Sequence, residues 1–585
     1  MADGTVGYDN EAYVGDGDGS GKAKKYQQGD HADSHRMTKY DKAVLFGIII
    51  VLVAVVAITL IFAVDWTNGD DGNMDSRQQG STIPPTTQMA ADMTTAERPP
   101  CGDLGKPPHI VLVLADDVGW NDVGWNNDFM PTPILNELAS NGVILNNTYS
   151  QPACSPSRAA LLTGKYPANA GIQHLVVQEQ HPYYLPLHNT LLSTKLKELG
   201  YMNHAIGKWH LGFCNWKYTP LWRGFDSFYG IFNGYLSDYS THIVHSPFIG
   251  EPGASGLDLR DNTGVVAHEN GTHVTYLFTE RAERIIRNHN PAAPLFLYTA
   301  LLVPHGPLDA PPGFENSVEV NDTRRREYAG MISAMDEAVG NITNALKDKG
   351  MWNDTLFIFL SDNGGDMFYA GNNYPFRGNK ASLWEGSVKI PGFIYGNMLE
   401  KKGYSNNELI HFTDLFATLL SAAGGTPDDD IDGINQWDTV CRGDASKRSE
   451  ILLHLDTFEA TRGAALRMND YKYIEGITEL VPQRVEAHER FHLDQWYVPA
   501  EHPDAPIPDA PLISQNVNNT FLFNLRDDPL ETTNLATDPE MQDILEEMQA
   551  RLQYYKDNAA PLWYPENIDE SDPKYFDGAW TPGWC

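Results

Sequence analysis

Short apolar runs that stop abruptly at polar residues constrain the fold of this chain more than any other feature of its sequence. The clearest run is 109–115, HIVLVLA, which Asp116 and Asp117 follow at once. A continuous apolar run of this length is typical of a strand buried on both faces of a parallel sheet. Further strands are expected at 202–206, 294–302 and 355–360, and helices near 133–141, 156–163, 190–199, 273–289 and 325–348. Strands that alternate with helices predict an α/β fold with a largely parallel sheet.

The composition changes along the chain and divides it into segments. Residues 1–42 show no apolar periodicity and are expected to form a disordered tail. The uncharged, mostly aliphatic run 43–64 is long enough to span a bilayer as a helix. Residues 65–107 have few large apolar side chains, which predicts a stalk. The alternating pattern then predicts a main domain over 108–440, and the irregular spacing beyond it predicts a smaller C-terminal α+β domain over 441–585.

Charges beside the run 43–64 predict how it would be oriented. Lys39 and Lys42 precede the run and Asp65 follows it, so the N-terminus should stay cytoplasmic. The run is too long and starts too late for a cleaved signal peptide, which leaves a type II signal anchor. The N-x-Ser/Thr sequons all lie beyond the stalk and fit a lumenal or extracellular location; they are Asn146, Asn270, Asn321, Asn341, Asn353 and Asn518. Golgi, cell-surface and endolysosomal membranes all remain possible.

Composition limits the class of partner. The chain has 585 residues, of which 20% are charged and 11% aromatic, which is typical of a globular protein with a large core. Its formal net charge of −35 disfavours a nucleic-acid partner. An anionic substrate would therefore have to be held by local cations against the field of the whole molecule.

The stretch 151–164, QPACSPSRAALLTG, is the most chemically suggestive part of the sequence. Pro156 suits the first turn of a helix and Gly164 suits its end, so Cys154 should lie at or just before a helix N-terminus. Unpaired N–H groups and the positive end of the dipole favour an anion there. Arg158 lies about one turn further on and can direct its donors to the same place. The alternative is that Cys154 is a small buried residue without a chemical role.

Cys154-x-Pro156-Ser157-Arg158 followed by Thr-Gly resembles the signature of the formylglycine-dependent sulfatases. In that family the cysteine is oxidised to formylglycine by a formylglycine-generating enzyme, and the aldehyde hydrate is the nucleophile. The second hydroxyl of the hydrate provides a way to release sulfate that a serine or threonine lacks. The resemblance implies an alkaline-phosphatase-like fold, in which helices sandwich a mostly parallel sheet.

Two pairs of polar residues follow expected strands and are candidate metal ligands. Asp116-Asp117 and Asp362-Asn363 would lie at the carboxyl ends of strands, where ligands bind in open α/β sheets. Their oxygen donors suit Ca²⁺ or Mg²⁺ rather than zinc. A turn or a helix cap is the alternative for either pair alone. The resemblance assigns all four as ligands of one divalent cation, usually calcium, with the formylglycine at Cys154 completing the set.

The resemblance also assigns roles to cations and imidazoles in the segments GKWHLG, PH and FRGNK. Lys208 and Lys380 would clamp sulfate oxygens. His305 would act as general acid toward the leaving alcohol. His210, on the same side as Lys208 if the segment is extended, would help to remove the proton that starts sulfate elimination. Arg158 would hold the formylglycine hydroxyl and offset nearby negative charge.

The resemblance covers roughly 108–540 and looks closest to the arylsulfatase B group, the N-acetylgalactosamine-4-sulfatases. It implies a substrate that is a sulfated sugar, such as N-acetylgalactosamine 4-sulfate of dermatan or chondroitin sulfate, or an aryl sulfate. Possible substrate contacts, for which packing is an equal alternative, are Gln173, His174, Tyr235, His242 and Trp384.

Two other functions remain open at this point: a phosphate or phosphonate ester hydrolase of the same superfamily, and a non-catalytic surface protein that binds sulfated glycans.

The chain has five cysteines, an odd number. If Cys154 is the modified one, Cys101, Cys214, Cys441 and Cys585 could form two disulfides, whose pairing the sequence does not reveal.

Overall fold

The computed structural model describes residues 101, 105–246, 253–458, 462–478, 480, 495–509 and 519–585. The predicted tail at 1–42, the predicted membrane span at 43–64 and nearly all of the predicted stalk at 65–107 lie outside these residues. None of the helices in the described ranges combines the length and the apolar character needed to cross a bilayer.

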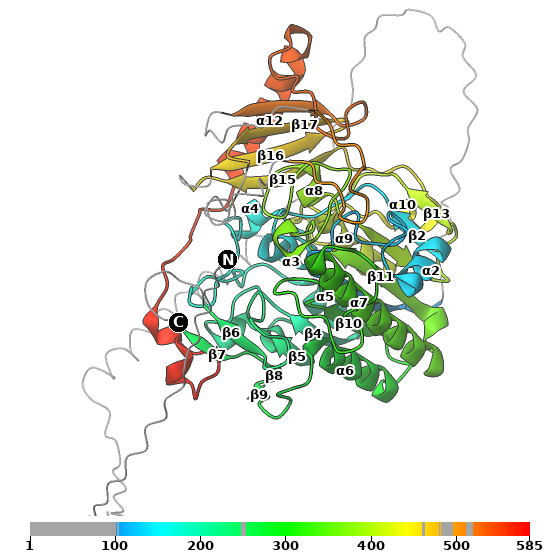
Figure 1. Ribbon diagram of the computed structural model, residues 1–585, viewed down its shortest axis with the longest axis vertical. Coiled ribbons are helices and arrows are strands. Elements are labelled where there is room, and N and C mark those ends of the chain that lie inside the picture. Colours follow the sequence, from blue (N-terminus) through cyan, green and yellow to red (C-terminus); the bar gives the residue numbers. More distant parts are fainter. Residues whose placement is uncertain are drawn as a thin grey trace, which may run out of the picture. The chain divides into compact units, whose positions relative to one another are not determined.

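A ten-stranded mixed sheet is the central element of the described chain (Figure 1). Its central strands are parallel and lie side by side in the order β11 (Thr355–Ser361), β1 (His109–Ala115), β10 (Leu295–Ala300), β4 (Met202–Lys208) and β5 (Ser227–Ile231). Shorter strands complete both edges: β12 (Gly392–Tyr395), β2 (Val143–Leu145), β13 (Tyr404–Asn406), β8 (Arg260–Asp261) and β9 (Gly264–Val265). Every residue of β1 is buried, as its continuous apolar run predicted. The largely parallel sheet is confirmed for its centre, while most of the edge pairings are antiparallel.

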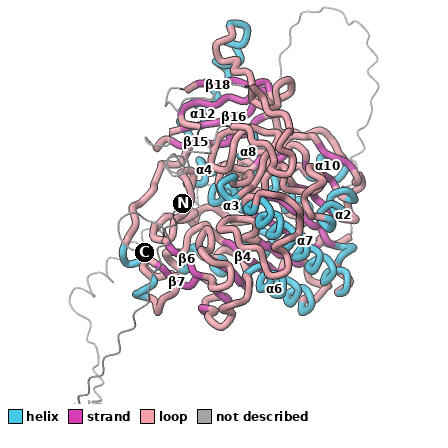
Figure 2. The backbone as a smooth tube through the Cα atoms, viewed as in Figure 1, coloured by secondary structure: helices cyan, strands magenta, loops and turns pink. Residues whose placement is uncertain are grey.

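Two groups of helices pack against this sheet (Figure 2). One group consists of α2 (Pro133–Asn141), α6 (Val274–Asn288) and α7 (Thr323–Asp348). The other consists of α3 (Cys154–Thr163), α5 (Leu192–Glu198) and α9 (Phe412–Ala422). The helices predicted from the sequence are therefore confirmed, with ends that differ by a few residues.

Short elements connect these parts. The helices are α4 (Pro167–Ala170), α8 (Glu385–Val388) and α10 (Trp437–Arg442). The strands form two small pairs, β3 (Thr148–Tyr149) with β14 (Ile410–His411), and β6 (Ile243–His245) with β7 (Ser255–Leu257).

A second, antiparallel sheet follows the large one in sequence and has its own apolar core (Figure 1). Its strands, in order, are β15 (Glu450–Asp456), β16 (Gly463–Met468), β17 (Tyr471–Gly476) and β18 (Thr520–Asn524). The helix α12 (Gln542–Asn558) packs on it. This is the small α+β part expected near the C-terminus. The last residues behave differently, because Trp580 and Trp584 belong to the core of the large sheet.

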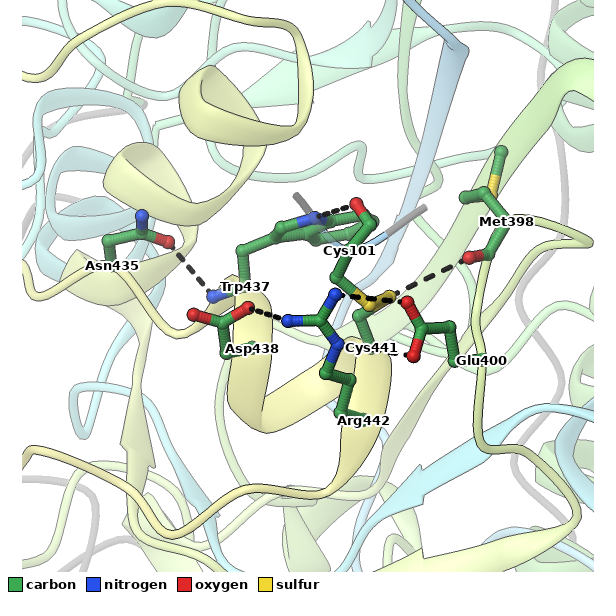
Figure 3. Close-up of a disulfide and its surroundings, with 8 residues drawn as sticks. All are labelled: Cys101, Met398, Glu400, Asn435, Trp437, Asp438, Cys441 and Arg442. Carbon is green, nitrogen blue, oxygen red and sulfur yellow. Dashed lines mark hydrogen bonds and ion pairs between the residues drawn. A yellow bond between two sulfur atoms is a disulfide. The ribbon is translucent and has the colours of Figure 1, made fainter. Parts of the chain in front are cut away.

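Two disulfides join residues that are far apart in sequence. Cys101 pairs with Cys441, and the Trp437 indole N–H donates to the Cys101 carbonyl beside this bond (Figure 3). Cys214 pairs with the C-terminal residue, Cys585. Cys154 is the cysteine left over and it is buried. The expectation of two disulfides that exclude Cys154 is therefore confirmed, and the structure supplies the pairing that the sequence left open.

Candidate active site

Adjacent parallel strands of the large sheet end beside one another and carry the predicted site residues. The strands β11, β1, β10 and β4 are consecutive in the sheet, so their carboxyl ends meet at one edge. The segments that leave these ends deliver Asp116, Asp117, Asp362, Asn363, Lys208 and His305. All of these residues except His305 are buried, and His305 is nearly so.

Helix α3 brings Cys154 and Arg158 to the same place. The helix begins at Cys154, after Ala153 in an extended conformation, and ends at Gly164 in the left-handed conformation. The Cys154 thiol lies 3.6 Å from Asp116 Oδ1. Arg158 donates from Nε and Nη2 to Asp362 Oδ2 over 3.0 and 2.7 Å. The predicted helix start and the predicted direction of Arg158 are both confirmed.

Lys380 comes from a loop that is tied to the same helix start. The N–H of Ala381 donates to the Pro152 carbonyl over 2.8 Å, and the Lys380 N–H donates to Gly365 O. The Lys380 ammonium donates to Asp117 Oδ2 over 2.7 Å. The loop therefore places a buried cation next to the carboxylate that follows β1.

The site balances three buried carboxylates with three buried cations. Lys208 Nζ donates to Asp116 Oδ2 over 2.7 Å, Lys380 pairs with Asp117, and Arg158 pairs with Asp362. Burial raises the pKa of Asp116 to about 7 against the opposing charge of Lys208. Burial also acts to raise the pKa of Asp117, but Lys380 and His305 hold it below its ordinary value. Removing one member of a pair would leave the other as an uncompensated buried charge, so each charge in the site depends on its partner.

The donor set fits a hard divalent cation. Ligand atoms of Asp116, Asp117, Cys154 and His305 all lie within 4.8 Å of one another. Asn363 Nδ2 donates to Asp117 Oδ1 over 2.7 Å, whereas its amide oxygen is buried and meets no donor in the described ranges. An amide oxygen in that state costs free energy unless it has a ligand. Carboxylate and amide oxygens are the donors that Ca²⁺ and Mg²⁺ prefer.

Both predicted imidazoles lie at this site, and burial lowers the pKa of each. His305 Nδ1 donates to Gly306 O over 2.6 Å, which leaves Nε2 3.6 Å from Asp117 Oδ2. Burial, then the Lys380 charge, lowers the pKa of His305 to about 3. His210 Nε2 donates to Val177 O over 2.9 Å, and burial followed by the Lys208 charge puts the His210 pKa well below its ordinary value. The expected extended conformation ends before His210, whose φ is 57°.

Sequence reasoning missed residues that hold the site together from outside it. Ser155 Oγ donates to the His210 carbonyl over 2.8 Å and accepts from the Val177 N–H. Tyr328 on α7 donates to Asp122 Oδ2 over 2.7 Å and also contacts the Asp117 carbonyl at 3.1 Å. No sequence pattern signals these contacts, because each joins segments that only the fold brings together.

The possible substrate contacts divide into two kinds. Trp384 is fully buried against Phe521 and Phe523, and His242 is buried with its Nε2 donating to Thr272 O, so packing explains both. Gln173 donates to Ala560 O, and His174 pairs with Asp456 on β15, so the contacts of both are with the C-terminal part of the chain. Tyr235 is different, because its ring stacks beside that of His305.

Comparison with known proteins supports the same interpretation. The family model "Sulfatase" matches residues 108–425. Arylsulfatase J of Mus musculus is 36% identical over 510 residues, which cover 83% of this chain and 82% of that protein. N-acetylgalactosamine-6-sulfatase of Mus musculus is 32% identical over 59% of this chain and 68% of its own length. The crystal structure of Ps i-CgsB in complex with k-i-k-neocarrahexaose is 26% identical, with a TM-score of 0.64 and coverage of 81% of this chain and 99% of that one.

The chain belongs to the sulfatase family and is a sulfatase enzyme. The alkaline-phosphatase-like fold that the resemblance implied is confirmed as well. The matches do not single out the 4-sulfatase group among the sulfatases.

Proposed function

We propose that this enzyme hydrolyses sulfate esters of sugars, with formylglycine formed from Cys154 and one divalent cation, Ca²⁺ or Mg²⁺. The observation that carries the proposal is the buried cluster at the start of α3, where ligand atoms of Asp116, Asp117 and Cys154 lie within 4.8 Å of one another, together with the Asn363 oxygen, which meets no donor among the described residues. When present, the cation and the formylglycine hydrate together supply an ionised hydroxyl nucleophile beside a polarised sulfate oxygen.

The lysines and the arginine have distinct tasks in this proposal. Lys208 and Lys380 each hold one carboxylate at 2.7 Å, and their ammonium groups are positioned to bind sulfate oxygens that approach the same carboxylates. Arg158 donates from Nε and Nη2 to one oxygen of Asp362 and cannot lose its proton, so it keeps that carboxylate ionised. This division supports the sulfate-clamp role for the two lysines.

The imidazoles complete the proton transfers. His305 would protonate the leaving alcohol, and the negative charge of a bound sulfate ester beside it would raise its pKa toward that of a working acid. His210 has its Nε2 proton engaged with Val177 and its Nδ1 buried with no hydrogen-bond partner in the described part of the chain. Nδ1 is therefore available to accept a proton, which supports the base role.

The substrate class is inferred from the relatives. One relative is named N-acetylgalactosamine-6-sulfatase, and one structural neighbour was solved in complex with k-i-k-neocarrahexaose. These names support a sulfated sugar but favour neither the 4-sulfate nor the 6-sulfate. Release of sulfate from matched chondroitin 4-sulfate and 6-sulfate disaccharides, compared with an aryl phosphate as control, would assign the position and exclude a phosphatase.

We also propose that residues 43–64 anchor the enzyme as a type II membrane protein with its catalytic part on the lumenal or extracellular side. That side is where the formylglycine-generating enzyme would act and where the two disulfides would form. Glycosidase shifts at the sequons and alkaline extraction of membranes would test this topology.

Peptide mass spectrometry across residue 154 is the decisive experiment, on protein expressed through the secretory pathway together with the formylglycine-generating enzyme. A peptide about 18 Da lighter than the cysteine form, the loss expected when a thiol side chain becomes the aldehyde nucleophile, would support the proposal. The C154A variant should reach the same membrane fraction as the wild type and show no turnover. An unmodified thiol in active enzyme would contradict the proposal.

A further inference from the structure

The exposure of the site residues indicates where substrate approaches. The side chains of Asp116, Asp362, Lys208 and Arg158 are 0% exposed. Only His305 at 12% and Lys380 at 9% reach solvent appreciably among the charged residues of the site. A sulfate ester must therefore enter on the His305 side, with its alcohol part still outside the buried cluster.

Tyr235 flanks His305 on this open side. The two ring centroids lie 6.5 Å apart and the ring planes differ by 18°. Tyr235 lies on the segment between β5 and β6, and its hydroxyl is held by the His245 carbonyl. Tyr239, from the same segment, donates to the His305 carbonyl over 2.6 Å, so this segment is fixed relative to His305. The Tyr235 ring is only partly buried, although it is anchored at its hydroxyl.

Tyr369 flanks His305 from a different segment. A Cβ added to Gly306 would lie 2.3 Å from Tyr369 Cγ, so the tyrosine ring packs directly on the residue that accepts the His305 Nδ1 proton. Tyr369 ends a short 3₁₀ turn that the Asp366 carboxylate caps by accepting from the Phe368 N–H. Tyr235 and Tyr369 therefore approach this part of the site from two different segments, one beside the His305 ring and the other on the glycine that follows it.

We propose that Tyr235 and Tyr369 form a leaving-group wall that selects sulfate esters whose alcohol is a ring, either a pyranose or an aryl group. The proposal rests on the function proposed above, because it takes His305 as the acid that protonates the leaving oxygen. An alcohol within reach of His305 lies between two partly exposed aromatic rings. Aromatic faces gain free energy from flat apolar surfaces that an open-chain alcohol cannot offer.

The test compares Y235L and Y369L with Y235F and Y369F, which keep the rings. The substrates are 4-nitrophenyl sulfate, a sulfated N-acetylgalactosamine and ethyl sulfate, and the competing ligand is inorganic sulfate. Tyr575, which is 61% exposed and lies outside the site, provides the control variant Y575L. Formylglycine content and the melting temperature are measured for each protein.

Each leucine variant should raise KM for both ring substrates about five- to tenfold, the loss expected for one aromatic contact. The inhibition constant for inorganic sulfate should stay within about twofold, because the lysine clamp is intact. The phenylalanine variants and Y575L should match the wild type. Similar kinetics on ethyl sulfate in wild type and leucine variants would identify the ring as the feature that is selected.

Three results would overturn the wall. The first is an unchanged KM for ring substrates in both leucine variants. The second is an equal rise in KM and in the sulfate inhibition constant, which would mean that the whole site is disturbed. The third is loss of ring selectivity in the phenylalanine variants. A fully modified wild-type enzyme that hydrolyses none of the three esters would overturn the proposed function, and the wall with it.

Discussion

At the scale of single residues, His210 depends on its neighbours for a conformation it would rarely adopt alone. Its φ of 57° is uncommon outside glycine and costs free energy. Three hydrogen bonds hold it there: its N–H donates to Phe232 O, its carbonyl accepts from Ser155, and its Nε2 donates to Val177 O. Because Ser155 also binds the Val177 N–H, one hydroxyl fixes both the backbone and the ring partner of His210.

Replacing Ser155 by alanine should therefore misplace His210 without removing it. We expect kcat to fall about tenfold or more, with little change in KM, since buried partners are left unsatisfied. S155T keeps the hydroxyl and should restore the rate. A crystal structure of S155A should show the imidazole rotated away from Val177. Wild-type kcat in S155A, with full conversion of Cys154, would contradict this positioning role.

The difference between Ser155 and Cys154 shows what the sequence can reveal about a site. Cys154, Arg158 and the two polar pairs, Asp116-Asp117 and Asp362-Asn363, stand in local patterns whose chemistry can be inferred from residue type and spacing, and the structure brings them together. Ser155 acts across three segments that are remote in sequence, so its contacts follow from tertiary packing alone.

At the scale of elements, the start of α2 depends on a carboxylate from another helix. Thr132 precedes the helix but gives it no side-chain cap. Instead Asp336 on α7 accepts from the N–H groups of Ile134 and Leu135 over 3.1 and 2.8 Å. The interaction also places negative charge at the positive end of the helix dipole.

The variant D336A should lower the free energy of unfolding by about 2 kcal/mol, because two N–H groups lose their acceptor and the helix loses its cap. D336N keeps an acceptor oxygen and should lose less. Thermal unfolding monitored by calorimetry measures both. Equal melting temperatures for D336A and wild type would show that water replaces the cap without cost.

Helix α12 is attached to the small sheet by the Glu450 carboxylate, whose pKa is lowered in the folded protein. Glu450 on β15 accepts from Arg551 Nε over 2.8 Å and from the Tyr555 hydroxyl over 2.7 Å. Burial acts to raise the pKa of Glu450, but the bonds from Arg551 and Tyr555 hold it below its ordinary value of 4.5.

A lowered pKa in the folded state fixes the sign of the pH dependence. The carboxylate stabilises the fold above pH 4.5, and this contribution is lost as the pH falls through the folded-state pKa. E450Q should therefore melt below the wild type at pH 6, and the two melting temperatures should converge in more acidic buffer. A gap that widens on acidification would show that the pKa is raised instead.

Some of the elements that the sequence did not predict are short or lie at an edge, whereas others, such as α9 and α12, are long helices. Strands such as β8 and β9 have two residues each, too few to show an alternating pattern. The strand β12, which is antiparallel to β11, is an apolar segment in the sequence. Its direction could not be predicted from this pattern, because the path of the chain between strands sets the direction of each strand. The long buried strands carry enough pattern to be predicted, and they are the ones that position the site.

At the scale of the whole molecule, the last residues of the chain pack in the core of the large sheet, although they follow the small sheet in sequence. Trp580 is fully buried, its indole N–H donates to Val244 O, and its carbonyl accepts from Arg260 over 2.6 Å. The Cys214–Cys585 disulfide then fixes the end of the chain to a segment 371 residues away. The domain boundary predicted near residue 440 stays a prediction. Trp580 and Trp584, which lie after it, pack in the same core as residues that precede it.

The double variant C214S/C585S tests how much this return contributes. Removing a disulfide that closes so long a loop typically costs about 2–4 kcal/mol, so the melting temperature should fall by several degrees. Trp580 should become accessible to fluorescence quenchers and the final residues to protease before the rest unfolds. Turnover below the melting temperature should be unchanged, because the predicted catalytic residues all come from earlier segments. A fall in turnover without a loss of stability would contradict this expectation. It would mean that the C-terminal segment supports the active site directly and does not only stabilise the core of the large sheet.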